Sequence, residues 1–162
     1  MQLRFLARSF QTILMASMVS GLAHADTAED AQAAFTRFFS EFVSRNQVQV
    51  AAMFAPDAQF YGTVSPALVT TPEGVLGYFT VALDRPDVTE ARALNLTTTA
   101  LTDSIALVAG TWKVDRTVDG KTTIGDPLRI TAVLQKRSGR WMVVQFHNSR
   151  LPAPPPPPSP AK

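Results

Sequence analysis

The chain has 162 residues, of which 46% are hydrophobic and 17% charged, and this composition suits one small globular domain rather than two full-size domains. It contains no cysteine, which excludes disulfides, cysteine-built zinc or iron–sulfur sites and a thiol nucleophile. The formal net charge is +2. Two of the basic residues are arginines close to the N-terminus, so the charge of the mature protein depends on whether this end is cleaved off.

The first 25 residues have the pattern of a secretory signal peptide. Arg4 and Arg8 give a positive start, residues 12–22 are mainly apolar, and Ala23-His24-Ala25 is a small-x-small cleavage site. The apolar stretch is too short for a membrane-spanning helix, which needs about 20 residues. We therefore predict that residues 1–25 are a signal peptide and that the mature protein is periplasmic or secreted, with no membrane association. The alternative is an uncleaved anchor.

Cleavage would remove two of the fifteen basic residues and none of the thirteen acidic ones, which leaves a formally neutral chain. A neutral surface argues against a dedicated nucleic-acid-binding protein. His147 would be the one remaining histidine, so a metal site with several histidine ligands is excluded, and no carboxylate cluster replaces it. Because the sequence also lacks a Gly-rich dinucleotide fingerprint, we predict no metal and no cofactor.

The first half of the mature chain predicts three helices and one short strand. Apolar residues recur at helical spacing in the first helix, and Pro72 stands in the first turn of the third. The second helix ends at Ala55-Pro56, because the residue before proline avoids the helical conformation. The predicted elements are helices over residues 27–45, 47–54 and 72–83, with a strand over 57–61 and a loop over 62–71.

The second half alternates β-branched and polar residues, which is typical of strands. Asp119-Gly120 and Ser138-Gly139 stand where two-residue hairpin turns are needed. We therefore predict an α+β fold in which three helices precede a four-stranded antiparallel meander, and the curved sheet wraps the N-terminal helix. The predicted strands cover residues 89–99, 104–118, 122–136 and 141–150.

The mature chain is expected to hold one domain over residues 26–151 and a proline-rich tail over residues 152–162. The tail contains five consecutive prolines, Pro154 to Pro158, and has no hydrophobic face to bury. Such a segment is expected to be polyproline-II-like or disordered. A solvated spacer is the simpler interpretation, and a docking site for a proline-reading domain is the alternative.

Three segments resemble, in this order, the nuclear transport factor two-like superfamily. They are Ala-Pro-Asp-Ala at residues 55–58, Phe-Tyr-Gly-Thr-Val-Ser-Pro at 60–66, and Gly-Arg-Trp-Met-Val-Val-Gln-Phe-His-Asn-Ser-Arg at 139–150. The last is similar to SgcJ/EcaC and SnoaL-like bacterial proteins, and the set also resembles the association domain of calcium/calmodulin-dependent kinase type II. The resemblance implies a cone with a cavity at its open end and a homodimer through the outer sheet face. Because this superfamily includes enzymes and non-catalytic modules, it does not decide the function.

Steroid isomerases of this superfamily need a carboxylate base and an acid that stabilises a dienolate. The resemblance places Gly62 at the position of the base and Phe38 at that of the oxyanion tyrosine, which argues against this mechanism. Asp57 and His147 remain as candidate catalytic residues. Asp57 has an alternative role in satisfying turn amides, and His147 has one in packing or in the interface.

The resemblance matches the pocket arginines of association domains with Lys113, Ala132 and Asn148, so one cation is kept. If Asn148 faces inward, strand alternation places Met142, Val144 and Phe146 inward with it. Trp141, Val143, Gln145 and His147 then face a dimer partner.

Tyr61 has an alternative role in filling the mouth of the core, and Lys113 has one in reaching solvent. The candidate ligand-binding residues are Tyr61, Tyr78, Thr111, Lys113 and Asn148.

Together these observations predict an exported homodimeric module with a small apolar pocket, which binds a small molecule or serves assembly. The alternative is a cofactor-independent SnoaL-like enzyme, of the isomerase, cyclase or dehydratase type, that acts on a small organic substrate.

Overall fold

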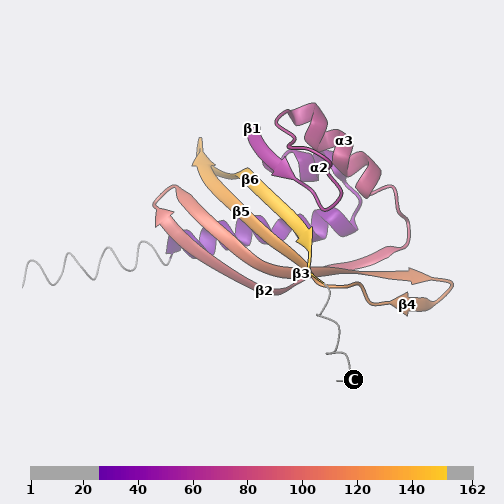
Figure 1. The fold of residues 1–162 in the computed structure, drawn as a ribbon. Coiled ribbons are helices and arrows are strands. Elements are labelled where there is room, and N and C mark those ends of the chain that lie inside the picture. Colours follow the sequence, from indigo (N-terminus) through magenta and orange to yellow (C-terminus); the bar gives the residue numbers. More distant parts are fainter. Residues whose placement is uncertain (1–25, 153–162) are drawn as a thin grey trace, which may run out of the picture.

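The computed structural model describes residues 26–152, so the predicted signal peptide and residues 153–162 of the predicted tail lie outside the described residues. The N-terminal helix covers residues 26–43, and Figure 1 shows it lying across a strongly curved sheet. The remaining elements are α2 (Gln47–Ala51), β1 (Phe54–Tyr61), α3 (Pro72–Ala82), β2 (Val88–Thr102), β3 (Ile105–Val118), β4 (Lys121–Thr123), β5 (Leu128–Arg137) and β6 (Arg140–Arg150).

The N-terminal helix buries one face rich in phenylalanine against the sheet. Phe35, Phe38 and Phe39 are each at most 5% exposed. Phe38 lies at the centre, with its ring in contact with Phe79 of α3 and with Phe146 of β6. Because burying a phenylalanine side chain contributes roughly 1.5–3 kcal/mol, this face is enough to fix the helix on the sheet.

The two short helices begin at side-chain caps. Asn46 accepts a hydrogen bond from the Gln49 backbone N–H at the start of α2. Thr71 accepts one from Gly74 at the start of α3, where proline occupies the first position. The predicted second helix is too long at its end, because Phe54 is already part of β1. Pro56 is tolerated there because β1 is an edge strand.

The predicted α+β class and curved sheet are confirmed, but the sheet has six strands and is mixed. The strand order is β1-β6-β5-β3-β2, with β4 paired to β3. The four long strands form the predicted antiparallel meander. In contrast, β1 pairs in parallel with β6, which the long connection between them allows.

Both predicted hairpin turns are present. Asp119 and Gly120 have φ angles of 50° and 76°, and Ser138 and Gly139 have φ angles of 50° and 78°. Two successive positive φ angles are the signature of the turn whose twist matches that of paired strands.

Residues 124–127 break the predicted strand over residues 122–136 into β4 and β5. The Gly125 backbone N–H donates to Oδ1 of Asp115 at 3.0 Å instead of joining a strand ladder. Pro127 has no N–H to donate. The chain therefore leaves the sheet here, and residues 125–127 line the cavity described below.

A β-bulge in β6 shifts the side-chain alternation. Val133 of β5 pairs with Gln145, whereas the next residue, Leu134, pairs with Val143. Val144 is therefore an extra residue on β6. The side chains of residues 140–143 lie on the sheet face opposite to the one that uninterrupted alternation predicts.

This bulge corrects the predicted orientation of Trp141 and Val143. Val143 is 2% exposed in the core, and Trp141 packs against the same core rather than facing a dimer partner. Trp141 pairs with Lys136, whose Nζ lies 5.7 Å from the centre of the Trp141 ring. The prediction is wrong because it assumes that side chains alternate without interruption from Asn148 to Trp141, whereas the bulge at Val144 interrupts the alternation.

Candidate functional site

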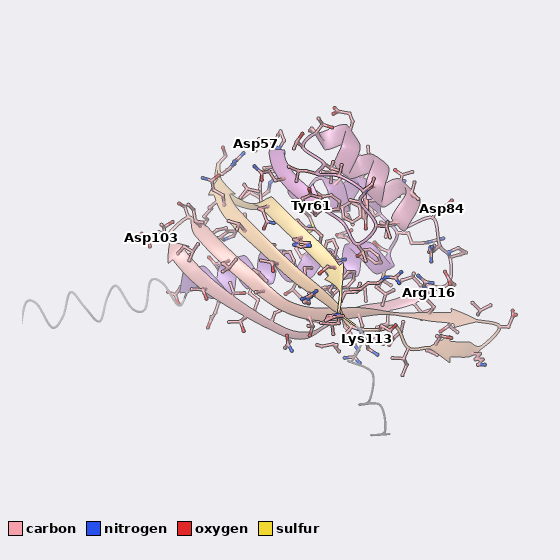
Figure 2. All side chains as sticks on the ribbon, in the orientation of Figure 1. Asp57, Tyr61, Asp84, Asp103, Lys113 and Arg116 are labelled. Carbon is pink, nitrogen blue, oxygen red and sulfur yellow. The ribbon has the colours of Figure 1, made fainter. Side chains whose placement is uncertain are left out.

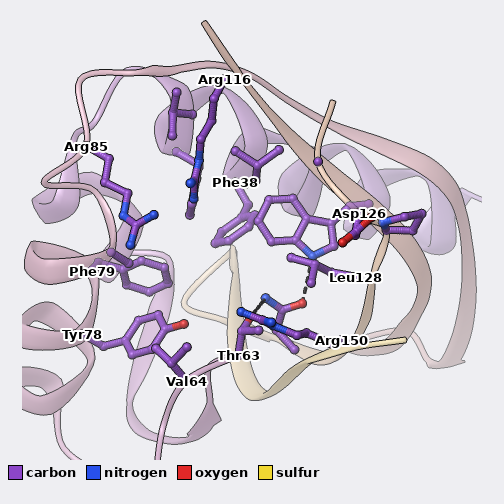
Figure 3. A pocket seen from close by; sticks show the side chains of 18 of the residues that line it. Phe38, Thr63, Val64, Tyr78, Phe79, Arg85, Arg116, Asp126, Leu128 and Arg150 are labelled. Carbon is purple, nitrogen blue, oxygen red and sulfur yellow. Dashed lines mark hydrogen bonds between the residues drawn. The ribbon is translucent and has the colours of Figure 1, made fainter. Parts of the chain in front are cut away.

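A cavity of about 1160 Å³ lies between the N-terminal helix, α3 and the inner face of the sheet. It is slightly larger than the roughly 300–1,000 Å³ typical of small-molecule sites. Its walls are mainly apolar and aromatic (Figure 3). The aromatic lining residues are Phe38, Phe42, Tyr78, Phe79, Trp112 and Phe146.

A hydrogen-bonded chain crosses the base of this cavity. Nε1 of Trp112 donates to Oδ1 of Asn148 at 2.9 Å, and Nδ2 of Asn148 donates to Oγ1 of Thr63 at 2.6 Å (Figure 3). Asn148 is buried. Because the two bonds use different ends of its amide, they fix the orientation of the side chain.

Tyr78 of α3 lies next to this chain, against the residue before Thr63. Its ring covers Gly62, where any Cβ would overlap Cζ and Cε2 of Tyr78, so only glycine fits beneath it. Burial raises the pKa of the Tyr78 hydroxyl above its usual value. Hydrogen bonding to the Thr63 side chain and to the backbone of Val64 and Thr63 opposes this rise in the pKa. The phenol therefore remains protonated at neutral pH.

The charged residues of the cavity are mostly arginines. Arg85, Arg116 and Arg150 line it together with one acidic residue, Asp126. Figure 3 shows the guanidinium groups of Arg85 and Arg116 both turned into the cavity. Nε of Arg116 lies 3.9 Å from Oδ2 of Asp87, at the limit of an ion pair. Within residues 26–152, Arg85 makes no ion pair or hydrogen bond.

Two of the predicted ligand-binding residues, Tyr78 and Asn148, line the cavity, and Tyr61 does not. Phe60 points into the core, so its neighbour Tyr61 faces the outer side of the sheet, where it is 41% exposed. Tyr61 pairs with His147, a predicted catalytic candidate, and their ring centres are 6.1 Å apart. Both therefore lie on the outer sheet face, away from the cavity.

Thr111 and Lys113 also lie on the sheet face opposite the cavity, because Trp112 between them points inward. The Lys113 side chain is not free: its Nζ lies 2.8 Å from Oδ2 of Asp115, and both residues are buried. The expected arrangement of Tyr61 and Lys113 around one ligand is not found.

Asp57, the other catalytic candidate, lies on β1, far from Lys113 along the sheet (Figure 2). Its two carboxylate oxygens accept hydrogen bonds from Arg137, at 2.6 and 3.1 Å. These bonds lower the pKa of Asp57 below its usual value. Because its side chain is 67% exposed and does not line the cavity, Asp57 serves a surface ion pair.

Four residues that line the cavity were not predicted from the sequence: Thr63, Arg85, Trp112 and Arg116. The inward position of Trp112 would have identified Arg116, which is four residues later on β3 and therefore on the same face. Thr63 and Arg85 lie outside the helices and strands, so no periodic pattern could place them.

Among residues 26–152, no group of three histidine, aspartate or glutamate side chains is placed to hold a metal ion. Nor does any helix in this range have both the length and the apolar character of a membrane span.

Solved structures with the same fold come from several sources. A Xanthomonas campestris protein named after the calcium/calmodulin-dependent protein kinase II association domain is 28% identical, with a TM-score of 0.65 over 73% of this chain and 83% of its own. The hub homology domain of that kinase from Chlamydomonas reinhardtii is 21% identical, with a TM-score of 0.64 over 77% and 98%. A Streptomyces avermitilis protein of the nuclear transport factor two-like family, named as a dehydratase, is 14% identical, with a TM-score of 0.66 over 80% and 99%.

No curated protein matches the chain. The structural neighbours confirm the predicted resemblance to the nuclear transport factor two-like superfamily. The family model of the SnoaL-like domain matches residues 31–154, most of the chain. The chain therefore belongs to the SnoaL-like domain family.

Proposed function

We propose that the protein binds a small organic anion in the cavity, with Arg85 and Arg116 holding the anionic group. The observation that carries this proposal is the presence of two guanidinium groups turned into a mainly aromatic cavity. Arg85 has no partner among the described residues, and Arg116 has only the distant Asp87. Both are therefore available to a ligand.

The chemistry of the two ends of such a ligand follows from the lining. A guanidinium group offers a planar fork of donors that matches a carboxylate. The rings of Phe38, Phe79 and Trp112 offer an apolar surface for the body of the molecule. A carboxylic acid that carries an aromatic ring is the simplest compound with both features.

The test compares 4-phenylbutanoate with its neutral amide, by calorimetry on the mature protein. We expect the acid to bind at least about tenfold more tightly, since a charged hydrogen bond contributes about 1.5–3 kcal/mol. Arg85→Gln and Arg116→Gln should each remove most of this preference. The matched control is Arg140→Gln, which changes an arginine outside the cavity. Equal affinity for acid and amide in the wild-type protein would overturn the proposal.

Assembly is the second proposed function, and the association-domain neighbours support it. We propose a homodimer that forms through the outer sheet face around Tyr61 and His147. Light scattering at micromolar concentration should give at least the mass of a dimer, and His147→Glu should lower it. Gln49→Glu, which adds the same charge on the exposed side of α2, is the control. A monomeric wild-type protein would contradict this proposal.

An enzyme of the isomerase, cyclase or dehydratase type is the alternative. Because Asp57 and His147 lie outside the cavity, Tyr78 is the stronger proton-donor candidate in this alternative. Native mass spectrometry of the purified protein should report any retained small molecule, which can then be tested for turnover. Conversion of that molecule, lost in Tyr78→Phe, would favour the enzyme over the binding module.

Export is also part of the proposal, on the basis of the N-terminal sequence pattern. The protein recovered from the periplasm or medium should begin at Asp26. A cell-associated protein that retains Met1 would contradict it.

A further inference from the structure

We propose that the Tyr78 hydroxyl donates a hydrogen bond to a carbonyl oxygen of the ligand. This inference rests on the proposed function, because it concerns the same cavity. It adds a second recognised group to the ligand, separate from the anion held by the arginines.

The direction of the chain follows from its first two bonds. Trp112 Nε1 can only donate, so the Asn148 oxygen accepts and the Asn148 nitrogen donates to Thr63. Oγ1 of Thr63 is therefore an acceptor in the 2.6 Å bond with Asn148. Its own proton is then available to another acceptor, and the Tyr78 ring lies over the neighbouring Gly62.

The turn at residues 62–65 begins beneath the Tyr78 ring, at Gly62. This turn is closed by the bond from Ser65 N to Gly62 O and by the bond from Gly62 N to Oγ of Ser65. The Thr63 side chain, and then the backbone of Val64 and Thr63, oppose the rise in the pKa of Tyr78 that burial causes. Because the Tyr78 side chain borders the cavity, its hydroxyl can turn its proton toward a ligand there.

A donor in an apolar site makes a stronger hydrogen bond than the same donor makes in water. The hydroxyl oxygen of Tyr78 and the guanidinium groups of Arg85 and Arg116 all border the same cavity (Figure 3). The ligand is therefore an anion whose apolar body also carries a carbonyl group.

The experiment measures binding of 4-oxo-4-phenylbutanoate and of 4-phenylbutanoate, which differ by the ketone. The indole N–H resonances of a ¹⁵N-labelled protein report on the site, because the chain has two tryptophans and only Trp112 lines the cavity. We expect the keto acid to bind about five- to tenfold more tightly, the factor that one hydrogen bond gives. It should also shift the Trp112 resonance more than that of Trp141.

Tyr78→Phe should reduce the affinity ratio to about one, because it removes the hydroxyl that donates to the ketone. Tyr61→Phe is the matched control, because it removes the other tyrosine hydroxyl, on the outer face, and should keep the ratio. Thr63→Val keeps the phenol but breaks the chain, so it should lower the ratio partly.

The outcomes separate this inference from the proposed function. If both acids bind equally to the wild-type protein, or if Tyr78→Phe keeps the ratio, the Tyr78 inference is overturned and the anion site stands. If neither acid binds, the anion site fails, and the neutral ketone butyrophenone decides the role of Tyr78. Butyrophenone binding that Tyr78→Phe abolishes would support the donor role, and no binding or unchanged binding would overturn it.

Discussion

Nε1 of Trp112 lies 2.9 Å from Oδ1 of Asn148, although β5 separates their two strands in the sheet. The large indole ring bridges this gap on the inner face, where both residues are buried. One bond therefore fixes the amide at the end of β6 and satisfies the indole N–H in an apolar cavity. It also makes the Asn148 amide the centre of the polar chain.

Asn148→Leu should lower the free energy of unfolding by about 2–3 kcal/mol, because it leaves the indole N–H of Trp112 without its acceptor and Thr63 without its donor. Urea denaturation checks this value. The matched control is Ser149→Ala, the next residue on β6, which should change stability by less than about 0.5 kcal/mol. A loss no larger than that of the control would show that water replaces the amide at little cost.

Gly62→Ala should destabilise the protein by about 1–3 kcal/mol, because the new methyl group must displace the Tyr78 ring. Gly77→Ala in α3 is the comparison, since nothing lies within 4 Å of its Cβ position. That substitution should raise stability by up to about 1 kcal/mol, the helix preference for alanine over glycine. A Tyr78→Ala background should remove most of the Gly62→Ala cost, and an unchanged cost would exclude this ring as its source.

Locally determined features of the fold could be predicted from the sequence. The phenylalanine face of residues 26–43 follows from helical spacing, and the turns at Asp119-Gly120 and Ser138-Gly139 follow from residues that accept positive φ angles. These features need no knowledge of distant contacts. Asn148 could be placed at the cavity because the family resemblance matches it with a pocket arginine of association domains.

The features of the fold and the site that could not be predicted depend on strand pairing and packing between residues far apart in the sequence. The bulge at Val144 depends on how β6 registers with β5, and no residue pattern within β6 marks it. Lys113 was expected at the cavity because it is the one cation kept at the matched positions. It instead forms a buried ion pair on the other face of β3. Arg85 and Thr63 reach the cavity from connecting segments whose path is set by tertiary packing.

Acid should destabilise the protein through Asp115. The hydrogen bond from Lys113, and then that from the Gly125 N–H, lower the pKa of Asp115 below 3.8. This stabilisation is complete above pH 3.8 and is lost as the pH falls through the lower pKa of the folded state. Asp115→Asn should therefore flatten the acid limb of a stability–pH curve from urea denaturation and lower stability at neutral pH.

Asp57→Asn is the comparison for Asp115→Asn, because Asp57 also has a lowered pKa in an ion pair. Its partner Arg137 has a partly exposed side chain and can be solvated when left alone, whereas Lys113 is 6% exposed. The loss at neutral pH should therefore be larger for Asp115→Asn. Equal losses would mean that Lys113 reaches water once its partner is removed.

Alkaline pH should destabilise the protein through Tyr78. Burial raises the pKa of this phenol above 10.0, so the folded state holds the proton more tightly than the unfolded chain does. Its contribution to stability is complete below pH 10 and is lost as the pH rises through the higher pKa of the folded state. Tyr78→Phe should remove this part of the decline between these two pH values, as measured by urea denaturation. The absorbance change of phenol ionisation should show one tyrosine that titrates late in the wild-type protein and is missing in Tyr78→Phe. If both tyrosines of the wild-type protein titrate together and Tyr78→Phe leaves the stability curve unchanged, the Tyr78 hydroxyl is solvated in the folded protein.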